Sequence, residues 1–220
     1  MKARRVNAMS SSDEAIAILK EGGIGVLATD TLYGLVARAL DERAVERVYQ
    51  AKGRNPEKPC IILIADISDL SKFGVSINEW IPGQARDDVN TRRLINQLWP
   101  GPVSIVFSTD RADLAYLHRG TGTLAFRQPA DAELRELLSV TGPLIAPSAN
   151  PEGQAPAKTI EKAEEYFSAP GGSASGGDGV VDFYVDSGPR TTAPSTLVEV
   201  VGEKVRVLRQ GSAIIPPELL

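Results

Sequence analysis

The pattern of apolar and polar positions predicts strands and helices that alternate along most of the chain. Apolar positions at helical spacing predict helices that begin near Ser11, Asp41, Asp131 and Thr159, and another that ends at Leu98. Short apolar runs predict strands at 24–28, 60–64, 103–108, 123–127, 144–146, 180–185, 195–201 and 204–208. Helices and strands interleave early and strands adjoin late. This order predicts an α/β fold with a mixed sheet and helices on its faces.

The same pattern sets the expected organisation of the chain. With 220 residues and 42% hydrophobic content, the sequence suits one globular domain, which we place at 11–215 between short tails at 1–10 and 216–220. The polar, aperiodic stretch 77–93 is predicted to be a surface insertion or a long loop. The Gly/Ser-rich stretch 171–179 is predicted to be a flexible loop.

The composition of the chain argues against several classes of function and site. A net charge of −4 argues against nucleic-acid binding by the whole surface. The single cysteine, Cys60, excludes an intrachain disulfide and a cysteine-based metal site, and its apolar surroundings favour a buried hydrophobic role. The single histidine, His118, stands in a polar stretch and is expected in a solvated loop. No apolar run approaches the roughly 18 residues of a membrane span, so a cytoplasmic location is expected.

Three short segments carry candidate binding chemistry. Lys52-Gly53-Arg54 places two cations around a glycine at a helix end, where they can converge on one polyanion. Ser148-Ala149-Asn150 follows a buried strand and offers a hydroxyl and an amide. The segment Thr29 to Gly34 offers hydroxyls and an aromatic ring on one loop. Taken singly, each also fits a plain helix end or turn. The P-loop and dinucleotide-binding glycine motifs are absent from the sequence.

Taken together, these segments and their order resemble the YrdC-like threonylcarbamoyl-AMP synthase family, also called TsaC. The resemblance runs from about Gly22 to Gly211. It is carried by Thr29-Asp30-Thr31-Leu32-Tyr33-Gly34-Leu35, Lys52-Gly53-Arg54, Leu98-Trp99-Pro100-Gly101-Pro102, Ala125-Phe126-Arg127, Pro147-Ser148-Ala149-Asn150-Pro151, Pro194-Ser195-Thr196 and Leu208-Arg209-Gln210-Gly211. It implies a twisted α/β sheet around a concave central cavity. It also implies synthesis of threonylcarbamoyl-AMP and pyrophosphate from L-threonine, bicarbonate and ATP.

The resemblance also implies roles for particular residues. The catalytic and nucleotide-binding residues would be Lys52, Arg54, Ser148 and Asn150, with Arg209 reaching the ATP phosphates. The threonine-binding residues would be Thr31, Tyr33, Thr123, Arg127 and Ser195. Mg2+ is expected to arrive on the ATP phosphates, with no metal held by the protein itself. The product would pass to a separate transferase complex that modifies tRNA.

Two positions depart from the family pattern, and two other functions remain open. Ala28 stands where the family usually has proline, and Leu63 stands where some relatives carry histidine. One alternative function is a double-stranded RNA-binding module, because family members have been linked to such RNA. The other is an ATP-binding regulator without turnover. RNA binding through phosphates would weaken steeply with salt, and pyrophosphate release separates an enzyme from a regulator.

Overall fold

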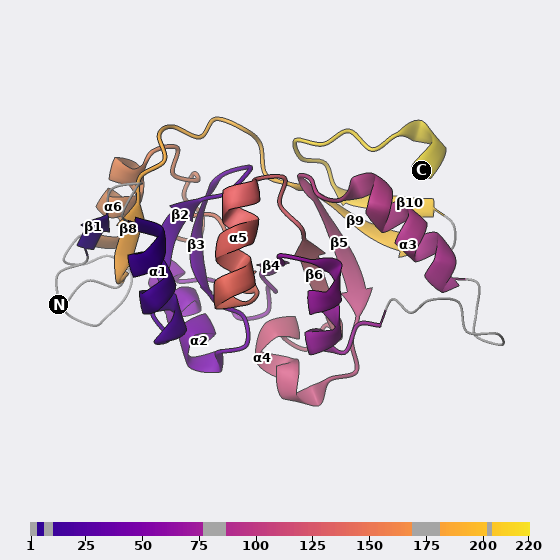
Figure 1. Cartoon of the computed structure of the whole chain (residues 1–220), viewed down its shortest axis with the longest axis horizontal. Coiled ribbons are helices and arrows are strands. Elements are labelled where there is room, and N and C mark those ends of the chain that lie inside the picture. Colours follow the sequence, from indigo (N-terminus) through magenta and orange to yellow (C-terminus); the bar gives the residue numbers. More distant parts are fainter. Residues whose placement is uncertain (1–3, 7–10, 77–86, 169–180, 202–203) are drawn as a thin grey trace.

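The computed structural model describes residues 4–6, 11–76, 87–168, 181–201 and 204–220, and it arranges them around one mixed sheet (Figure 1). The strands are β1 (Arg4–Val6), β2 (Gly25–Ala28), β3 (Tyr33–Arg38), β4 (Ile61–Leu63), β5 (Val103–Ser108), β6 (Thr123–Arg127), β7 (Leu144–Ile145), β8 (Phe183–Val185), β9 (Thr196–Val201) and β10 (Lys204–Arg209). Within the described ranges their order is β1-β8-β2-β3-β7-β4-β6-β5-β9-β10. Neighbours β4 and β6 are parallel, as are β5 and β9, whereas β5 and β6 are antiparallel. The predicted mixed sheet is confirmed.

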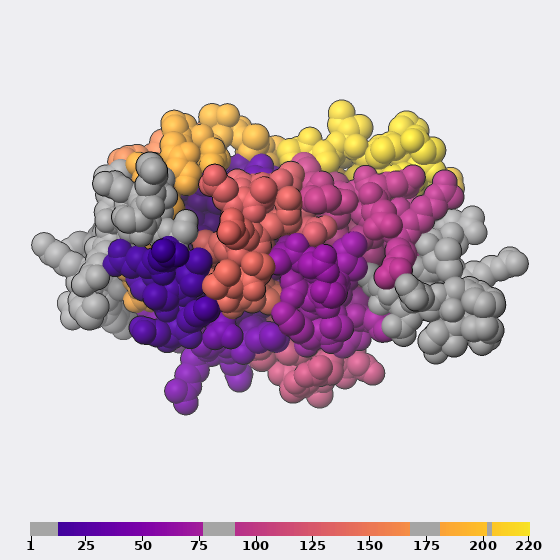
Figure 2. Space-filling view, viewed as in Figure 1, coloured from indigo at the N-terminus to yellow at the C-terminus, as the bar shows by residue number. Residues whose placement is uncertain are grey.

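Helices cover the sheet and close its apolar cores. They are α1 (Ser11–Lys20), α2 (Glu42–Lys52), α3 (Asp87–Leu98), α4 (Ala115–His118), α5 (Ala132–Thr141) and α6 (Ile160–Ser168), with 3-10 helices at Ile67–Phe73, Ala112–Leu114 and Pro217–Leu219. Helices α1 and α5 lie side by side (Figure 2), and their Leu19 and Leu138 pack in one core cluster with Phe183. The other helices contribute to a second, larger cluster. The prediction of flanking helices is therefore also confirmed.

Helix α2 is well specified by its sequence and ends beside the candidate motif. The side chain of Asp41 accepts a hydrogen bond from the Ala44 backbone amide at 3.0 Å, which caps the first turn. Val45 and Val48 are fully buried, as their helical spacing predicted. Gly53 follows with φ of 56°, a left-handed conformation that ends the helix with little strain because glycine lacks a Cβ.

One strand was missing from the sequence prediction. The chain was expected to remain in a polar loop as far as Gly34, but Tyr33–Arg38 forms strand β3 between β2 and β7. Its residues from Tyr33 to Ala37 are all buried. A strand buried on both faces has no alternation of polar and apolar positions, so the two-residue period gave no signal.

Both predicted tails contain regular structure. Arg4–Val6, predicted to be part of a short tail, forms an edge strand parallel to β8. At the other end, Pro217–Leu219 forms a 3-10 helix whose Leu219 is buried. Backbone pairing and apolar contacts with distant segments order these short stretches, and neither is visible in a local pattern.

The stretch predicted to be a surface insertion is partly helical. Helix α3 begins at Asp87, so the predicted loop 77–93 is wrong from 87 onward, while 77–86 lies outside the described residues. Leu94, Ile95 and Leu98 are buried in the second half of α3. The sequence from Asp87 to Arg93 contains one apolar residue, Val89, so it showed no apolar period. The predicted flexible loop at 171–179 also lies outside the described residues.

Candidate functional site

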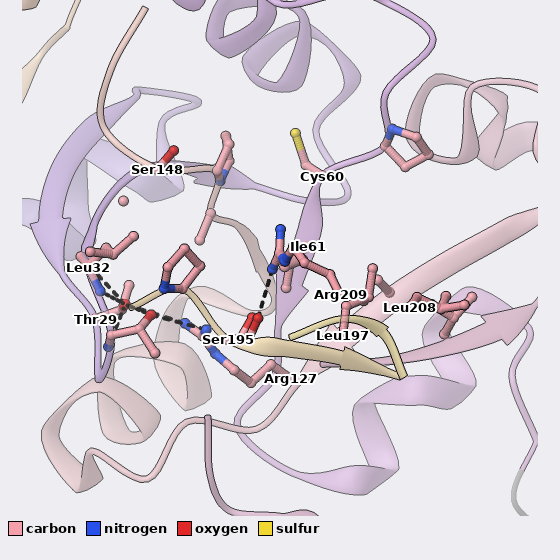
Figure 3. A pocket seen from close by; sticks show the side chains of 18 of the residues that line it. Thr29, Leu32, Cys60, Ile61, Arg127, Ser148, Ser195, Leu197, Leu208 and Arg209 are labelled. Carbon is pink, nitrogen blue, oxygen red and sulfur yellow. Dashed lines mark hydrogen bonds between the residues drawn. The ribbon is translucent and has the colours of Figure 1, made fainter. Parts of the chain in front are cut away.

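A cavity of about 470 Å3 opens on the sheet, and most of the predicted site residues lie along it (Figure 3). Its described walls come from the Thr29–Gly34 segment, the loop after α2, the loop after β7 and the ends of β9 and β10. The predicted site residues that line it are Thr31, Tyr33, Arg54, Thr123, Arg127, Ser148, Ser195 and Arg209. Lys52 and Asn150 do not belong to this lining and lie behind it.

The floor of the cavity is one row of side chains across four strands. Ile61 of β4 pairs with Ala125 of β6, Ala125 pairs with Val106 of β5, and Val106 pairs with Glu199 of β9. Residues that face each other across paired strands point to the same side of a sheet. The row therefore forms a mostly apolar shelf that ends at a carboxylate. The strands were predicted, but the pairing that joins these four residues was not.

Two residues along β6 from Ala125, Arg127 provides a buried cation beside this shelf. Its guanidinium donates to the Thr31 hydroxyl at 3.2 Å and to the Thr29 hydroxyl at 3.3 Å, and it forms an ion pair with Asp30 at 3.2 Å. Burial lowers the pKa of Arg127, and the Asp30 carboxylate acts in the opposite direction. Arg127 is 4% exposed, so its charge acts in a poorly hydrated part of the cavity.

Tyr33 has its hydroxyl engaged within the protein. The hydroxyl donates to the Gly188 carbonyl oxygen at 2.8 Å and accepts from the Ser187 amide at 3.0 Å. The Thr192 hydroxyl also donates to the Thr31 carbonyl oxygen. The segment that contains residues 187–192 therefore packs against the Thr31–Tyr33 wall and helps to fix it.

Ser195 and Arg209 form a second wall of the cavity. The Ser195 hydroxyl lies 2.9 Å from the Ser104 hydroxyl, and its carbonyl oxygen accepts a hydrogen bond from Arg209 at 2.9 Å. Ser195 is buried, whereas Arg209 stands at the exposed rim. Thr196, next in the chain, uses its hydroxyl to accept from the Gly211 amide. These bonds tie the ends of β9 and β10 together beside the cavity.

The two motifs with the strongest sequence signal meet at the third wall. Arg54 donates to the carbonyl oxygens of Lys58 and Pro59, at 3.1 and 3.0 Å, and its guanidinium lines the cavity. The Ser148 hydroxyl donates to the Asn150 side-chain oxygen at 2.6 Å. The Asn150 amide nitrogen donates to the carbonyl oxygens of Pro151 and Gln154. Asn150 therefore stabilises its own loop.

Lys52 lies beside this wall but not in it. Its ammonium contacts the carbonyl oxygens of Ser148 and Asn150, and the residue is 2% exposed. Burial and, to a lesser extent, the nearby Arg54 charge lower the pKa of Lys52 to about 8.

Several lining residues were not found from the sequence. Glu199, Val106, Ile61 and Thr121 line the cavity without belonging to any quoted motif. Alternation along each predicted strand could have selected the facing positions, but only the strand pairing shows that they share one floor. Cys60 was expected to be a buried hydrophobic residue; it is 4% exposed, its side chain reaches the cavity wall, and burial raises the pKa of its thiol.

Leu63 and His118, two residues singled out in the sequence, do not belong to the cavity lining. Leu63, one of the two departures from the family pattern, is fully buried in the smaller core cluster. His118 is the last residue of α4 and is partly buried, so the expected solvated loop is wrong in this detail. Across the described ranges, no helix is long and apolar enough to cross a membrane. The same residues contain no cluster of three or more His, Cys, Asp or Glu side chains suited to a metal ion.

The fold and the cavity define a class of α/β protein in which arginines, one buried and others nearer the surface, line a cavity that opens on a mixed sheet. Comparison with known proteins identifies the family. A family model for Sua5, YciO and YrdC proteins, described as telomere recombination, matches residues 17–211. The chain belongs to this Sua5/YciO/YrdC family.

Individual relatives agree with this assignment. A threonylcarbamoyl-AMP synthase from Pyrococcus abyssi is 30% identical over 200 residues, which cover 90% of this chain and 53% of the relative. A relative from Mycobacterium tuberculosis is 32% identical over 201 residues, which cover 90% of this chain and 82% of the relative. The crystal structure of P. abyssi Sua5 complexed with L-threonine matches with a TM-score of 0.77 and 26% identity, covering 95% of this chain and 58% of that one. The chain thus spans about half the length of the archaeal relative.

Proposed function

We propose that the chain is an L-threonylcarbamoyladenylate synthase, which makes threonylcarbamoyl-AMP and pyrophosphate from L-threonine, bicarbonate and ATP. The observation that carries the proposal is one cavity lined by three arginines, Arg54, Arg127 and Arg209, together with the hydroxyls of Thr31 and Ser195. Two anionic substrates held side by side need such a combination of cations and small donors. The name of the P. abyssi relative, threonylcarbamoyl-AMP synthase, supports this product, and the L-threonine bound to P. abyssi Sua5 supports threonine as a substrate.

The walls suggest where each substrate binds. Threonine is assigned to the end formed by Thr31, Arg127 and Ser195, where a buried guanidinium can pair with its carboxylate. The ATP phosphates are assigned to Arg54, Ser148 and Arg209. The apolar floor between these walls can accept the flat face of the adenine base.

The reaction needs no protein nucleophile. The threonine amine attacks the carbon of CO2 and loses a proton, or it attacks the carbon of bicarbonate and water leaves; either route gives a carbamate. A carbamate oxygen then attacks the α-phosphorus of ATP, and the bond to the bridging oxygen breaks so that pyrophosphate leaves with the electron pair. The contribution of this chain is to hold the two anions at reacting distance and to stabilise charge on the phosphates.

Mg2+ is proposed to enter with ATP. Of the described residues that line the cavity, Glu199 is the one carboxylate, and it forms an ion pair with Arg206. That donor set suits a metal held mainly by phosphate oxygens and water, which would neutralise phosphate charge when bound. The product is proposed to be passed to a tRNA-modifying transferase complex.

The test is pyrophosphate release measured with each substrate omitted in turn, together with mass analysis of the adenylate. Release that requires ATP, L-threonine and bicarbonate together, and a product with the mass of threonylcarbamoyl-AMP, are the expected results. ATP hydrolysis that continues unchanged without threonine or bicarbonate would contradict the proposal. Binding of ATP without any turnover would favour the regulatory alternative instead.

A further inference from the structure

The side chain of Lys52 is buried and does not belong to the cavity lining. It is the last residue of α2, it is 2% exposed, and the described lining of the cavity includes Arg54 and Ser148 but not Lys52. Gly53, in its left-handed conformation, separates the two cations and turns the chain between them. Although they belong to one short motif, Lys52 contacts a backbone loop, whereas Arg54 lines the cavity.

Lys52 contacts the backbone of the Ser148–Gln154 loop through its ammonium and through its own carbonyl oxygen. It donates to the carbonyl oxygens of Ser148 and Asn150, and the Lys52 carbonyl oxygen accepts from the Glu152 amide at 2.7 Å. A loop that directs two carbonyl oxygens at one buried point needs a donor with more than one hydrogen there. An ammonium group provides three hydrogens and a charge that attracts both oxygens.

The rest of this loop is tied to the sheet on its other side. The Ala149 amide donates to the Tyr33 carbonyl oxygen at 2.8 Å, and the Leu35 amide donates to the Pro147 carbonyl oxygen at 2.9 Å. Strand β3 thus holds one side of the loop and Lys52 holds the other. Between these two attachments the Ser148 side chain reaches the cavity.

We infer that Lys52 is a positioning residue: its ammonium holds the carbonyl oxygens of Ser148 and Asn150 and thereby sets where Ser148 meets the substrates, while Arg54 alone of this motif meets them directly. The inference rests on the proposed function for its consequence in turnover. Its structural half, the loop held by Lys52, can be tested without any activity.

The first experiment measures amide hydrogen exchange without substrates. In Lys52→Met the amides of Ala149, Glu152 and Gln154 are expected to exchange faster, because the donor that fixes their loop is gone. Arg209→Met is the matched control, since it removes a cavity cation that bonds the Ser195 carbonyl oxygen instead. Unchanged exchange in this loop in Lys52→Met would overturn the inference, whether or not the protein makes an adenylate.

If Lys52→Met does not fold, the same measurement is made on Lys52→Arg. The guanidinium keeps the charge, but its planar donors cannot match the ammonium geometry. Faster exchange confined to this loop is the expected result. Exchange identical to that of the natural protein would overturn the inference.

The second experiment is a double-mutant cycle on pyrophosphate release. If Lys52 acts through Ser148, the loss of kcat/KM caused by Lys52→Met should be at least about tenfold smaller in a Ser148→Ala background, because the two changes remove one shared interaction. Equal losses in both backgrounds would mean that Lys52 meets the substrates independently, which contradicts the inference. A protein that lacks adenylate synthesis altogether would instead contradict the proposed function.

Discussion

Arg127 and Asp30 form an ion pair at 3.2 Å, and their side chains are 4% and 8% exposed. Asp30 also accepts a hydrogen bond from the Ala130 amide at 3.2 Å, which connects the pair to the chain just after β6. The pair fixes a cation at the end of the cavity that is proposed to bind threonine, and it balances the charge of that cation. Buried charges persist in proteins mainly where they are paired in this way.

Removal of the Asp30 charge should therefore destabilise the fold. We expect Asp30→Asn to lower the free energy of unfolding by about 3 kcal/mol, because Arg127 is left buried without its counter-ion. Urea unfolding at neutral pH measures this change. Asp113→Asn is the matched control, since Asp113 pairs with Arg111 on the exposed surface and should leave stability almost unchanged. Equal losses in the two variants would show that the buried Asp30–Arg127 pair contributes no more to stability than the exposed Arg111–Asp113 pair.

The threonine end should discriminate between amino acids in a definite order. Threonine should be preferred to serine, and serine to valine, in kcat/KM at saturating ATP and bicarbonate. Loss of the methyl group in serine removes only apolar contact, worth about 1–3 kcal/mol. Valine keeps the shape but leaves a buried hydroxyl partner, Thr31 or Ser195, without its hydrogen bond, which costs more. Valine equal to serine would remove both residues from the substrate site.

A methyl group at position 211 should disturb the Ser195 wall. A Cβ added to Gly211 would lie 2.2 Å from the Pro194 carbonyl oxygen and 2.4 Å from the Ser195 carbonyl carbon. We expect Gly211→Ala to lower the free energy of unfolding by about 1–3 kcal/mol, because the backbone must shift. The shift should also raise the KM for threonine through Ser195. Unfolding measurements test the loss of stability, and initial rates test the rise in the KM for threonine. A variant with the stability and KM of the natural protein would show that a Cβ at position 211 is accommodated without a backbone shift.

The buried ammonium of Lys52 should make stability depend on pH. Burial lowers its pKa to about 8 from an ordinary value of 10.5, with Arg54 acting in the same direction. Between those two values the unfolded chain holds a proton that the folded protein has released, so rising pH favours the folded state. Relative to Lys52→Met, the natural protein should gain up to about 3 kcal/mol as pH rises from about 8 to 10.5.

Denaturant unfolding of the two proteins, measured in parallel across that interval, provides the comparison. Other titrating groups are common to both proteins, so their contributions cancel in the difference. Parallel curves for the two proteins would mean that Lys52 titrates as it does in the unfolded chain, which contradicts its burial.

Much of the local structure could be predicted because its signals are local. Asp41 caps α2, Gly53 ends it, and the buried Val45 and Val48 follow the helical period. Strand β3 could not be predicted in this way, since its burial on both faces removes the alternation that marks a strand. The edge strand Arg4–Val6 depends on pairing with β8, a partner far away in the sequence.

The residues of the candidate site could likewise be predicted only in part. The motifs pointed to Arg54, Ser148 and Arg209, and all three line the cavity. They could not show that Glu199 completes the floor, because that depends on the register of β9 against β5. Nor could they show that Asn150 bonds its own loop rather than facing the cavity.

The sequence by itself determined the chemical groups available and the family to which the chain belongs, because short motifs in a fixed order carry that information. Only the tertiary structure decided which of those groups face the cavity. Lys52 and Arg54 are two positions apart, yet one contacts the Ser148–Gln154 loop and the other lines the cavity. The physical reason is that side-chain direction depends on the backbone turn at Gly53 and on the carbonyl oxygens that a distant loop brings to Lys52.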